Sequence, residues 1–277
     1  MKTRIIAAVI FVPIIFIVLY FLPAYVLAGV ISLICAISAY ELLHAIGGKQ
    51  NERVRIYAVF AAVIIPIGAY FQLTYIIFPA VLLCLMSLLF FEAIIGYRTI
   101  RKISFAQILT TLFAGTLIPL MLSSLVNLKM MPEGHLLVLI PIISAFVTDG
   151  GAYFTGLKMG KKKVFPLVSP QKTIEGCIGG LIIGTLAVLI FGVVIVFSTY
   201  HLVVFWALFI YGIVGAVLSQ LGDLAFSLIK REFDVKDYGQ LIPGHGGMLD
   251  RFDSMIFAAP AIHLLVVLMP GIVSRLS

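Results

Sequence analysis

Long apolar runs, separated by short polar and basic stretches, make up most of this chain. Runs of roughly 18 or more apolar residues recur along it, and inside a bilayer only helices of that length or closed barrels satisfy every backbone hydrogen bond. The pattern predicts an all-α, polytopic integral membrane protein with about nine transmembrane helices. We expect these spans near residues 5–22, 24–46, 56–71, 74–96, 104–127, 135–156, 174–198, 202–222 and 254–272.

Composition supports the same class. Of the 277 residues, 62% are hydrophobic and 11% are charged, and the mean hydropathy of +1.18 excludes a water-soluble globular protein. Residues 1–22 have the outline of a secretory signal peptide, but their apolar run is long and no small-residue cleavage site follows. We interpret this segment as the first membrane anchor.

The basic residues predict the orientation in the membrane. With the spans above, 17 of the 19 Lys and Arg residues fall on one side, and only Lys129 and Arg275 fall on the other. Because cytoplasmic loops carry the excess of positive charge, we expect a cytoplasmic N-terminus and an external C-terminus. The same asymmetry accounts for the net charge of +7 without nucleic acid as a partner, and a basic face suits anionic lipid headgroups and phosphates.

An island of charge lies between Ser227 and Asp253. It holds nine of the 31 charged residues in 27 positions, together with a His and four glycines. If the eighth span continues as a helix, Asp223, Ser227 and Lys230 share one face. A carboxylate, a hydroxyl and an ammonium would then line one groove, although a salt-bridged pair of Asp223 and Lys230 at a helix end would also explain the pattern.

The second half of the island begins the last span. Asp250 and Asp253 are three residues apart and can share a helical face. Gly246 and Gly247 precede them, and their N–H groups at a helix start would suit a phosphate. Carboxylates that hold a divalent cation, beside cations that hold phosphate, indicate phosphate chemistry.

A second polar cluster lies between the sixth and seventh spans. Asp149 places a carboxylate inside an apolar helix, which is costly in a membrane and marks a functional site by default. Ser169 and Pro170 have the pattern of an N-cap followed by a first helical residue. We therefore expect a helix to begin there and to present Lys172, near Glu175, as a second anion site, although capping alone would explain Ser169 and Pro170.

The remaining polar residues of the spans have simpler interpretations. We expect Glu41, His44 and Glu92 to form structural hydrogen bonds or ion pairs near the cytoplasmic ends of their spans. The run from Lys161 to Lys163 is typical of a topology determinant. Structural roles are also expected for His135, His201 and His263, and buried apolar positions are expected for Cys35, Cys84 and Cys177.

The charge island resembles the signature of the phosphatidate cytidylyltransferases, also called CDP-diacylglycerol synthases. The residues that carry this resemblance are Ser227, Lys230, Arg231, Lys236, Asp237, Gly239, Pro243, His245, Gly246, Gly247, Asp250, Arg251 and Asp253. The upstream cluster is similar to that family as well, through Ser169, Pro170, Lys172, Thr173, Glu175 and Gly176. Chain length and the number of spans agree, so the resemblance covers essentially the whole chain.

The resemblance implies a reaction and a set of roles. CTP and phosphatidic acid would give CDP-diacylglycerol and pyrophosphate with Mg²⁺, in a homodimeric membrane enzyme, and a second metal or a monovalent cation is left open. Asp223 and Asp250 would be metal-binding carboxylates, and we add Asp253 to the metal site. The expected catalytic residues are Asp223, Lys230, Arg231, His245 and Asp250. The expected substrate-binding residues are Asp149, Ser169, Lys172, Thr173, Glu175, Ser227, Lys236, Asp237, Gly246, Gly247 and Arg251.

The charges suit such a transfer. A phosphate monoester is already an anion, so positioning and charge neutralisation matter more than a strong base. Lys230 and Arg231 would meet the charge that develops on pyrophosphate, while Lys172 or Arg251 would hold the lipid phosphate. We expect residues 1–130 to be a transmembrane scaffold with dimer contacts, and residues 131–277 to be the catalytic region. The site would face the cytoplasm from the inner membrane.

Two other functions remain open at this point. One is a cytidylyltransferase for another lipid phosphate, such as an isoprenoid ether lipid. The other is a secondary transporter of an anionic solute. Transporters place their sites at the membrane midplane within repeated, broken helices, whereas these clusters gather near one membrane face and no repeat is visible.

Overall fold

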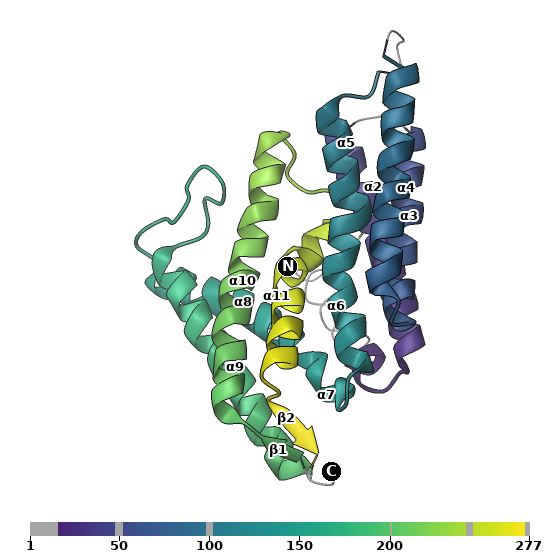
Figure 1. The fold of residues 1–277 in the computed structure, drawn as a ribbon. Coiled ribbons are helices and arrows are strands. Elements are labelled where there is room, and N and C mark those ends of the chain that lie inside the picture. Colours follow the sequence, from purple (N-terminus) through teal and green to yellow (C-terminus); the bar gives the residue numbers. More distant parts are fainter. Residues whose placement is uncertain (1–15, 48–51, 98–101, 200, 242–245, 275–277) are drawn as a thin grey trace. The chain divides into compact units, whose positions relative to one another are not determined.

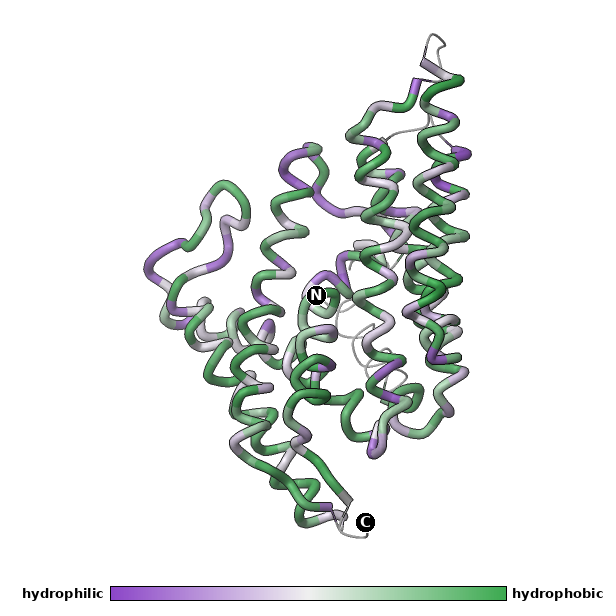
Figure 2. The backbone as a smooth tube through the Cα atoms, in the orientation of Figure 1, coloured by the Kyte–Doolittle hydropathy of each residue, from purple (hydrophilic) through white to green (hydrophobic). Residues whose placement is uncertain are grey.

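The structure of this chain is almost entirely helical (Figure 1). It is a computed structural model that describes residues 16–47, 52–97, 102–199, 201–241 and 246–274. In this part, eight helical segments are long and apolar enough to cross a membrane, and hydrophobic colour follows most of their length in Figure 2. The predicted all-α, multi-pass membrane protein is therefore confirmed. The first predicted span, near residues 5–22, lies mostly outside the described residues.

The chain forms two compact units, which we describe one at a time. Unit 1 comprises residues 1–127 and 233–251, and unit 2 comprises residues 128–232 and 252–277. The first boundary lies close to the expected division at residue 130, but residues 233–251 belong with unit 1. The scaffold and catalytic roles that we assigned to the two halves stay predictions.

Unit 1 contains the N-terminal helices. They are α2 (Ala24–Gly47), α3 (Glu52–Tyr70), α4 (Thr74–Ile95), α5 (Phe105–Leu112), the π-helical turn η1 (Phe113–Leu117), most of α6 (Ile118–Met130) and the first turn of α11 (Leu249–Leu268). Helix α5 begins at a capping box, in which Ser104 Oγ accepts the N–H of Gln107 and the Gln107 side chain accepts the N–H of Ser104. At η1, a Cβ on Gly115 would lie 3.0 Å from Cα of Ala58, so α3 packs closely against this turn.

Unit 2 is built on helices that approach one another closely through small residues. Its elements are α7 (Gly134–Leu137), α8 (Leu139–Met159), α9 (Ile174–Ser198), α10 (Phe205–Glu232), the rest of α11, and the antiparallel strands β1 (His201–Val203) and β2 (Ile272–Ser274). A Cβ on Gly176 would lie 2.8 Å from the Ala152 carbonyl oxygen, and one on Gly180 would lie 2.7 Å from that of Thr148. Small residues at such spacing let membrane helices pack backbone to backbone.

Helix boundaries agree with the sequence in some places and differ in others. Helix α9 coincides with the predicted span 174–198, and α10 continues as a helix to Glu232, as expected. The prediction that a helix begins at Ser169 and Pro170 is wrong, because Thr173 is the N-cap of α9 and its hydroxyl accepts the N–H of Gly176. Ser169 instead closes a turn, in which its carbonyl oxygen accepts the N–H of Lys172.

The cysteines also depart partly from expectation. Cys35 is buried, but Cys84 is exposed and Cys177 is half-buried, and all three are free thiols. Cys84 lies in α4, of which only 11% of the most apolar window is buried within the chain. An apolar residue of a membrane helix can face lipid as well as protein, so the apolar setting of Cys84 did not imply burial in the fold.

Candidate active site

An ion pair joins two of the predicted site residues within unit 2. The ammonium of Lys172 lies 2.6 Å from Oδ2 of Asp223, and their side chains are 17% and 30% exposed. Lys172 also donates to the carbonyl oxygen of Gln220, one helical turn before Asp223. The pair therefore connects the segment before α9 with the C-terminal half of α10.

Two further carboxylates lie near this pair in unit 2. Asp149 of α8 accepts a hydrogen bond from Ser254 of α11 at 2.9 Å. Asp253 is 7% exposed and lies within electrostatic range of Asp223, Lys230 and Asp149. One charged cluster therefore contains four predicted residues of α8, α10 and α11, which the sequence separates by up to 104 positions: Asp149, Asp223, Lys230 and Asp253.

Helix α10 approaches α11 closely beside these carboxylates. A Cβ on Gly222 would lie 2.7 Å from the carbonyl oxygen of Asp253, so only glycine lets the two backbones approach this closely. Gly222 directly precedes Asp223. Ser227, one turn further along α10, is buried with 9% of its surface exposed. The packing of the helices therefore fixes the polar residues of the cluster.

The loop between α8 and α9 is ordered by Glu175 and Arg231. Oε2 of Glu175 accepts the backbone N–H groups of Lys161 and Lys162, at 3.0 and 3.3 Å. The Arg231 side chain donates to the carbonyl oxygen of Val168 at 3.2 Å. The hydrogen bonds of Glu175 and Arg231 thus order this loop. Lys172 is the last residue of the loop before Thr173, the N-cap of α9.

Two backbone N–H groups of unit 1 donate to Asp250. Its Oδ2 accepts the N–H of Tyr238 at 2.9 Å and the N–H of Gly247 at 3.0 Å. The Gly247 donor that we expected to face a phosphate is therefore engaged by Asp250. Gly246 has a φ of 83°, a conformation that favours glycine, and a Cβ there would lie 3.3 Å from Oδ1 of Asp237.

The other predicted residues of this region lie at the surface or outside the described part. Lys236, Asp237 and Arg251 are exposed. His245, expected to be catalytic, lies outside the described residues. Asp250 and Asp253 are three residues apart within α11, as predicted, but Asp250 belongs to unit 1 and Asp253 to unit 2.

Glu41 of α2 contacts the island of charge between Ser227 and Asp253. The sequence did not indicate this contact. Oε1 of Glu41 accepts the N–H of Met248 at 3.0 Å, and its Oε2 accepts the N–H of Leu249 at 2.9 Å. The expected structural hydrogen bond is therefore confirmed for Glu41, as it is for Glu92, which accepts from Tyr57 at 2.7 Å. Nothing near Glu41 in the sequence identifies a partner 207 residues away.

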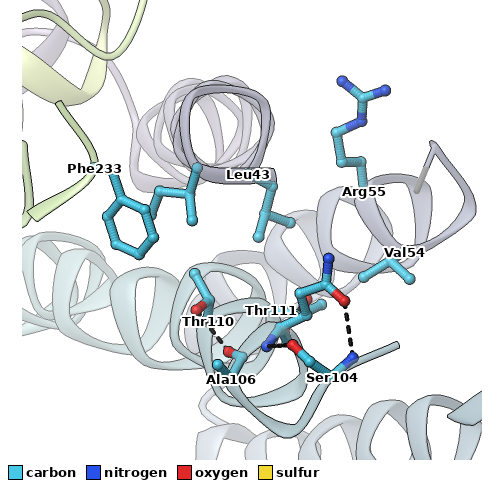
Figure 3. Close-up of a pocket in the computed structure, with 10 residues that line it drawn as sticks. Leu43, Val54, Arg55, Ser104, Ala106, Thr110, Thr111 and Phe233 are labelled. Carbon is cyan, nitrogen blue, oxygen red and sulfur yellow. Dashed lines mark hydrogen bonds between the residues drawn. The ribbon is translucent and has the colours of Figure 1, made fainter. Parts of the chain in front are cut away.

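Two cavities of unit 1 lie near the same end of α2. One, of about 500 Å³, is bordered by Tyr40, Glu41 and His44 of α2 and by residues 238–241. The other, of about 200 Å³, lies among α2, α3 and α5 (Figure 3) and is lined by none of the predicted site residues. Its hydroxyl groups are engaged locally, since Thr110 donates to Ala106 and Thr111 to Gln107. The first cavity is therefore the one that borders the motif.

The carboxylates of unit 2 suit a hard divalent cation. Carboxylate oxygens are the ligands that Mg²⁺ prefers, and Mg²⁺ is usually held by one or two of them together with substrate phosphates. No group of three or more His, Cys, Asp or Glu able to hold a metal ion occurs among the described residues. Asp223 and Asp253 are oxygen donors of the kind that Mg²⁺ binds, and they do not form a complete protein ligand set with other described residues.

Comparison with known proteins identifies close sequence relatives. The model of a family described as the cytidylyltransferase family matches residues 2–269. A protein of Thermotoga maritima named phosphatidate cytidylyltransferase is 31% identical over 291 aligned positions, which cover 99% of this chain and 98% of that protein.

Shorter alignments connect the chain to other proteins of the same name. The Staphylococcus saprophyticus protein is 42% identical over 135 residues, which is 49% of this chain and 50% of that protein. The Bacillus subtilis protein is 45% identical over 122 residues, or 44% of each chain. In these two alignments the chain spans about half the length of the relative that it matches.

Proposed function

Because this chain belongs to the cytidylyltransferase family, we propose that it transfers the cytidylyl group of CTP to phosphatidic acid. The products are CDP-diacylglycerol and pyrophosphate. The observation that carries this proposal is the alignment with the Thermotoga maritima phosphatidate cytidylyltransferase over 99% of the chain. A multi-pass membrane protein also suits a substrate whose acyl chains stay in the bilayer.

The charges of unit 2 support this chemistry. Attack by a lipid phosphate on the α-phosphorus of CTP brings two anions together and releases a third. Lys172, which is paired with Asp223, and Lys230, which lies within electrostatic range of Asp253, would neutralise phosphate charge from positions that they hold before the substrates arrive. Arg231 holds the loop that carries Lys172. Fixed cations of this kind lower the barrier without any reorganisation during the reaction.

The carboxylates have the complementary role in this proposal. Asp223 and Asp253 would hold Mg²⁺, with Asp250 kept as a further ligand predicted from the resemblance. A bound Mg²⁺ supplies charge neutralisation on the phosphates of CTP. The Asp149–Ser254 hydrogen bond fixes α8 to α11 beside the cluster.

The substrate class can be tested with purified protein. In detergent micelles, α-labelled CTP is incubated with Mg²⁺ and one of three lipid phosphates: phosphatidic acid, an isoprenoid ether-lipid phosphate, or ceramide 1-phosphate. We expect labelled CDP-lipid with phosphatidic acid at a rate at least about tenfold above the other two. A preference for the ether lipid would change the substrate, and no labelled lipid in any arm would contradict the function.

We expect direct transfer without a covalent enzyme intermediate. An activated nucleophile needs a base within hydrogen-bond reach and a third group that orients that base, and the glycines on both sides of His245 favour a binding turn instead. Lipid-free enzyme should therefore fail to exchange labelled pyrophosphate into CTP. Robust exchange would indicate a cytidylyl-enzyme, and its loss in His245→Ala would make His245 the carrier.

The location and assembly of the enzyme are part of the proposal. The distribution of the basic residues favours an inner-membrane protein whose site faces the cytoplasm. CTP is available on that side of the membrane. A homodimer is expected from the resemblance alone. Crosslinking of the protein in native membranes, followed by mass determination in detergent, tests this assembly.

A further inference from the structure

We propose that Glu41 is a positioning residue that holds the backbone near Asp250, at residues 238–239 and 247–250, in its active arrangement. This role rests on the proposed function. It goes beyond that function because Glu41 lies on α2, far in sequence from the charged motifs. All the contacts that carry the inference lie within unit 1.

The Glu41 carboxylate completes the start of α11. The first N–H groups of a helix have no partner within the helix, and here Glu41 accepts those of Met248 and Leu249, one on each oxygen. A carboxylate at this end also interacts favourably with the helix dipole. Glu41 is 7% exposed, so these hydrogen bonds form largely away from water and fix the helix start firmly.

Two glycines of the motif make room for this carboxylate. A Cβ on Gly239 would lie 2.6 Å from Cδ of Glu41, and one on Gly247 would lie 2.5 Å from its Oε2. Both separations are shorter than real Cβ contacts allow. Gly239 and Gly247 are thus both packed against the Glu41 side chain.

Asp250 adds a second carboxylate to the same arrangement. It accepts the N–H groups of Tyr238 and Gly247 and follows directly after Leu249. Glu41 and Asp250 therefore accept hydrogen bonds from three consecutive backbone N–H groups, those of Gly247, Met248 and Leu249. Displacement of Glu41 would shift the first turn of α11 and with it Asp250, a predicted metal ligand. Substitution of a residue that holds a metal ligand in place typically lowers metal affinity or activity by about 10- to 100-fold.

The test substitutes the carboxylate by its isosteric amide. Glu41→Gln keeps the shape but sets an NH₂ group against one of the two backbone donors, so one hydrogen bond is lost. We expect kcat for cytidylyl transfer to fall by about 10- to 100-fold and the amides of Met248 and Leu249 to exchange faster with solvent. The matched control is Glu92→Gln, which removes a carboxylate bonded to Tyr57 in the same unit. It should lower the unfolding temperature in detergent and leave kcat within about twofold of wild type, a change of at most about 0.4 kcal/mol in the barrier.

A second variant covers the case in which Glu41→Gln does not fold. Gly239→Ala leaves Glu41 in place but pushes a methyl group against its carboxylate, and it should lower kcat in the same way. If both variants fold, the double variant should lose much less than the product of the single losses, because both act on one contact.

The outcomes separate this inference from the proposed function. An active wild-type enzyme with unchanged kcat in Glu41→Gln, or with equal losses in Glu41→Gln and Glu92→Gln, would overturn the positioning role alone. Unchanged amide exchange at Met248 and Leu249 would overturn the contact itself. Wild-type protein that transfers no cytidylyl group would overturn the proposed function, and the positioning role would fall with it.

Discussion

The Lys172–Asp223 pair is partly open to water. Fully exposed ion pairs contribute little to stability, and fully buried pairs are costly to desolvate. With side chains 17% and 30% exposed, this pair lies between those limits. An incoming phosphate would take Lys172, and Asp223 would then be left for a cation. In the proposed function, the pair would keep both groups in place until substrate arrives.

Replacement of Asp223 by Asn tests its proposed role. We expect Asp223→Asn to lower kcat by on the order of 10²- to 10³-fold, as loss of one electrostatic group at a reaction centre commonly does. The unfolding temperature in detergent should change little, because the carboxylate is partly exposed. The rate of CDP-diacylglycerol formation and the thermal midpoint are the measurements.

Asp234→Asn is the matched control for this charge change. Asp234 is exposed and has a φ of 52°, a conformation that Asn tolerates well. It should retain activity within about twofold of wild type, equivalent to at most about 0.4 kcal/mol in the barrier. Near-normal turnover in Asp223→Asn, or equal losses in both variants, would remove Asp223 from the reaction.

At the scale of elements, the site depends on close packing of α8, α9, α10 and α11. Glycines of α9 lie against the backbone of α8, and Gly222 of α10 lies against that of α11. Without a hydrophobic driving force between helices in lipid, such close contact supplies much of the association. Side chains added at these positions should separate the helices that carry the charged cluster.

Gly180 offers a direct test of this packing. A Cβ at Gly180 would lie 2.7 Å from the Thr148 carbonyl oxygen, whereas one at Gly150 of α8 meets nothing within 4 Å. We expect Gly180→Ala to destabilise the protein by about 1 to 3 kcal/mol. Gly150→Ala should be neutral, or stabilising by up to about 1 kcal/mol through helix propensity. Thermal unfolding in one detergent compares them, and equal midpoints would contradict the packing.

Sequence patterns predicted elements better than they predicted contacts. Apolar length identified α9 to the residue, and the spacing of Asp223, Ser227 and Lys230 agrees with the helical extension of α10 to Glu232. The start of α9 was misplaced at Ser169, because Thr173 offers an equally good cap and Lys163 pairs with it as a β-bridge. Local pattern cannot choose between two caps when a distant pairing decides.

Long-range pairs explain what the sequence could not give. The sequence patterns placed Lys172 and Asp223 in separate clusters. Their ion pair depends on how α9 packs against α10. The sequence assigned Glu41 a structural hydrogen bond but not its partners at the start of α11. A hydrogen-bond partner is set by the tertiary fold, and residue type alone does not specify it.

At the scale of the whole molecule, the distribution of charge predicts one basic face. Of the 19 Lys and Arg residues, 17 fall on the side that we assign to the cytoplasm. Every residue of the proposed site lies on that side in the predicted topology. CTP, which does not cross membranes unaided, would reach the site directly from the cytosol.

Cysteine labelling in intact cells tests this topology. In a background with Cys35, Cys84 and Cys177 replaced by Ser or Ala, single cysteines are introduced by Gln240→Cys and Ser198→Cys, both at exposed positions. A membrane-impermeant maleimide should label position 198 in intact cells and position 240 only after permeabilisation. The reverse pattern would invert the topology and the route of CTP.

The central claim is transfer of a cytidylyl group to a lipid phosphate, and two positions of label in CTP test it most directly. Purified protein in liposomes that contain phosphatidic acid is given CTP labelled at either the α- or the γ-phosphate. We predict that α-label appears in lipid, that γ-label appears in pyrophosphate in equal amount, and that both depend on phosphatidic acid. γ-label in lipid would indicate phosphoryl transfer, and CTP that enters the liposomes unchanged would indicate transport. Either result would contradict the account.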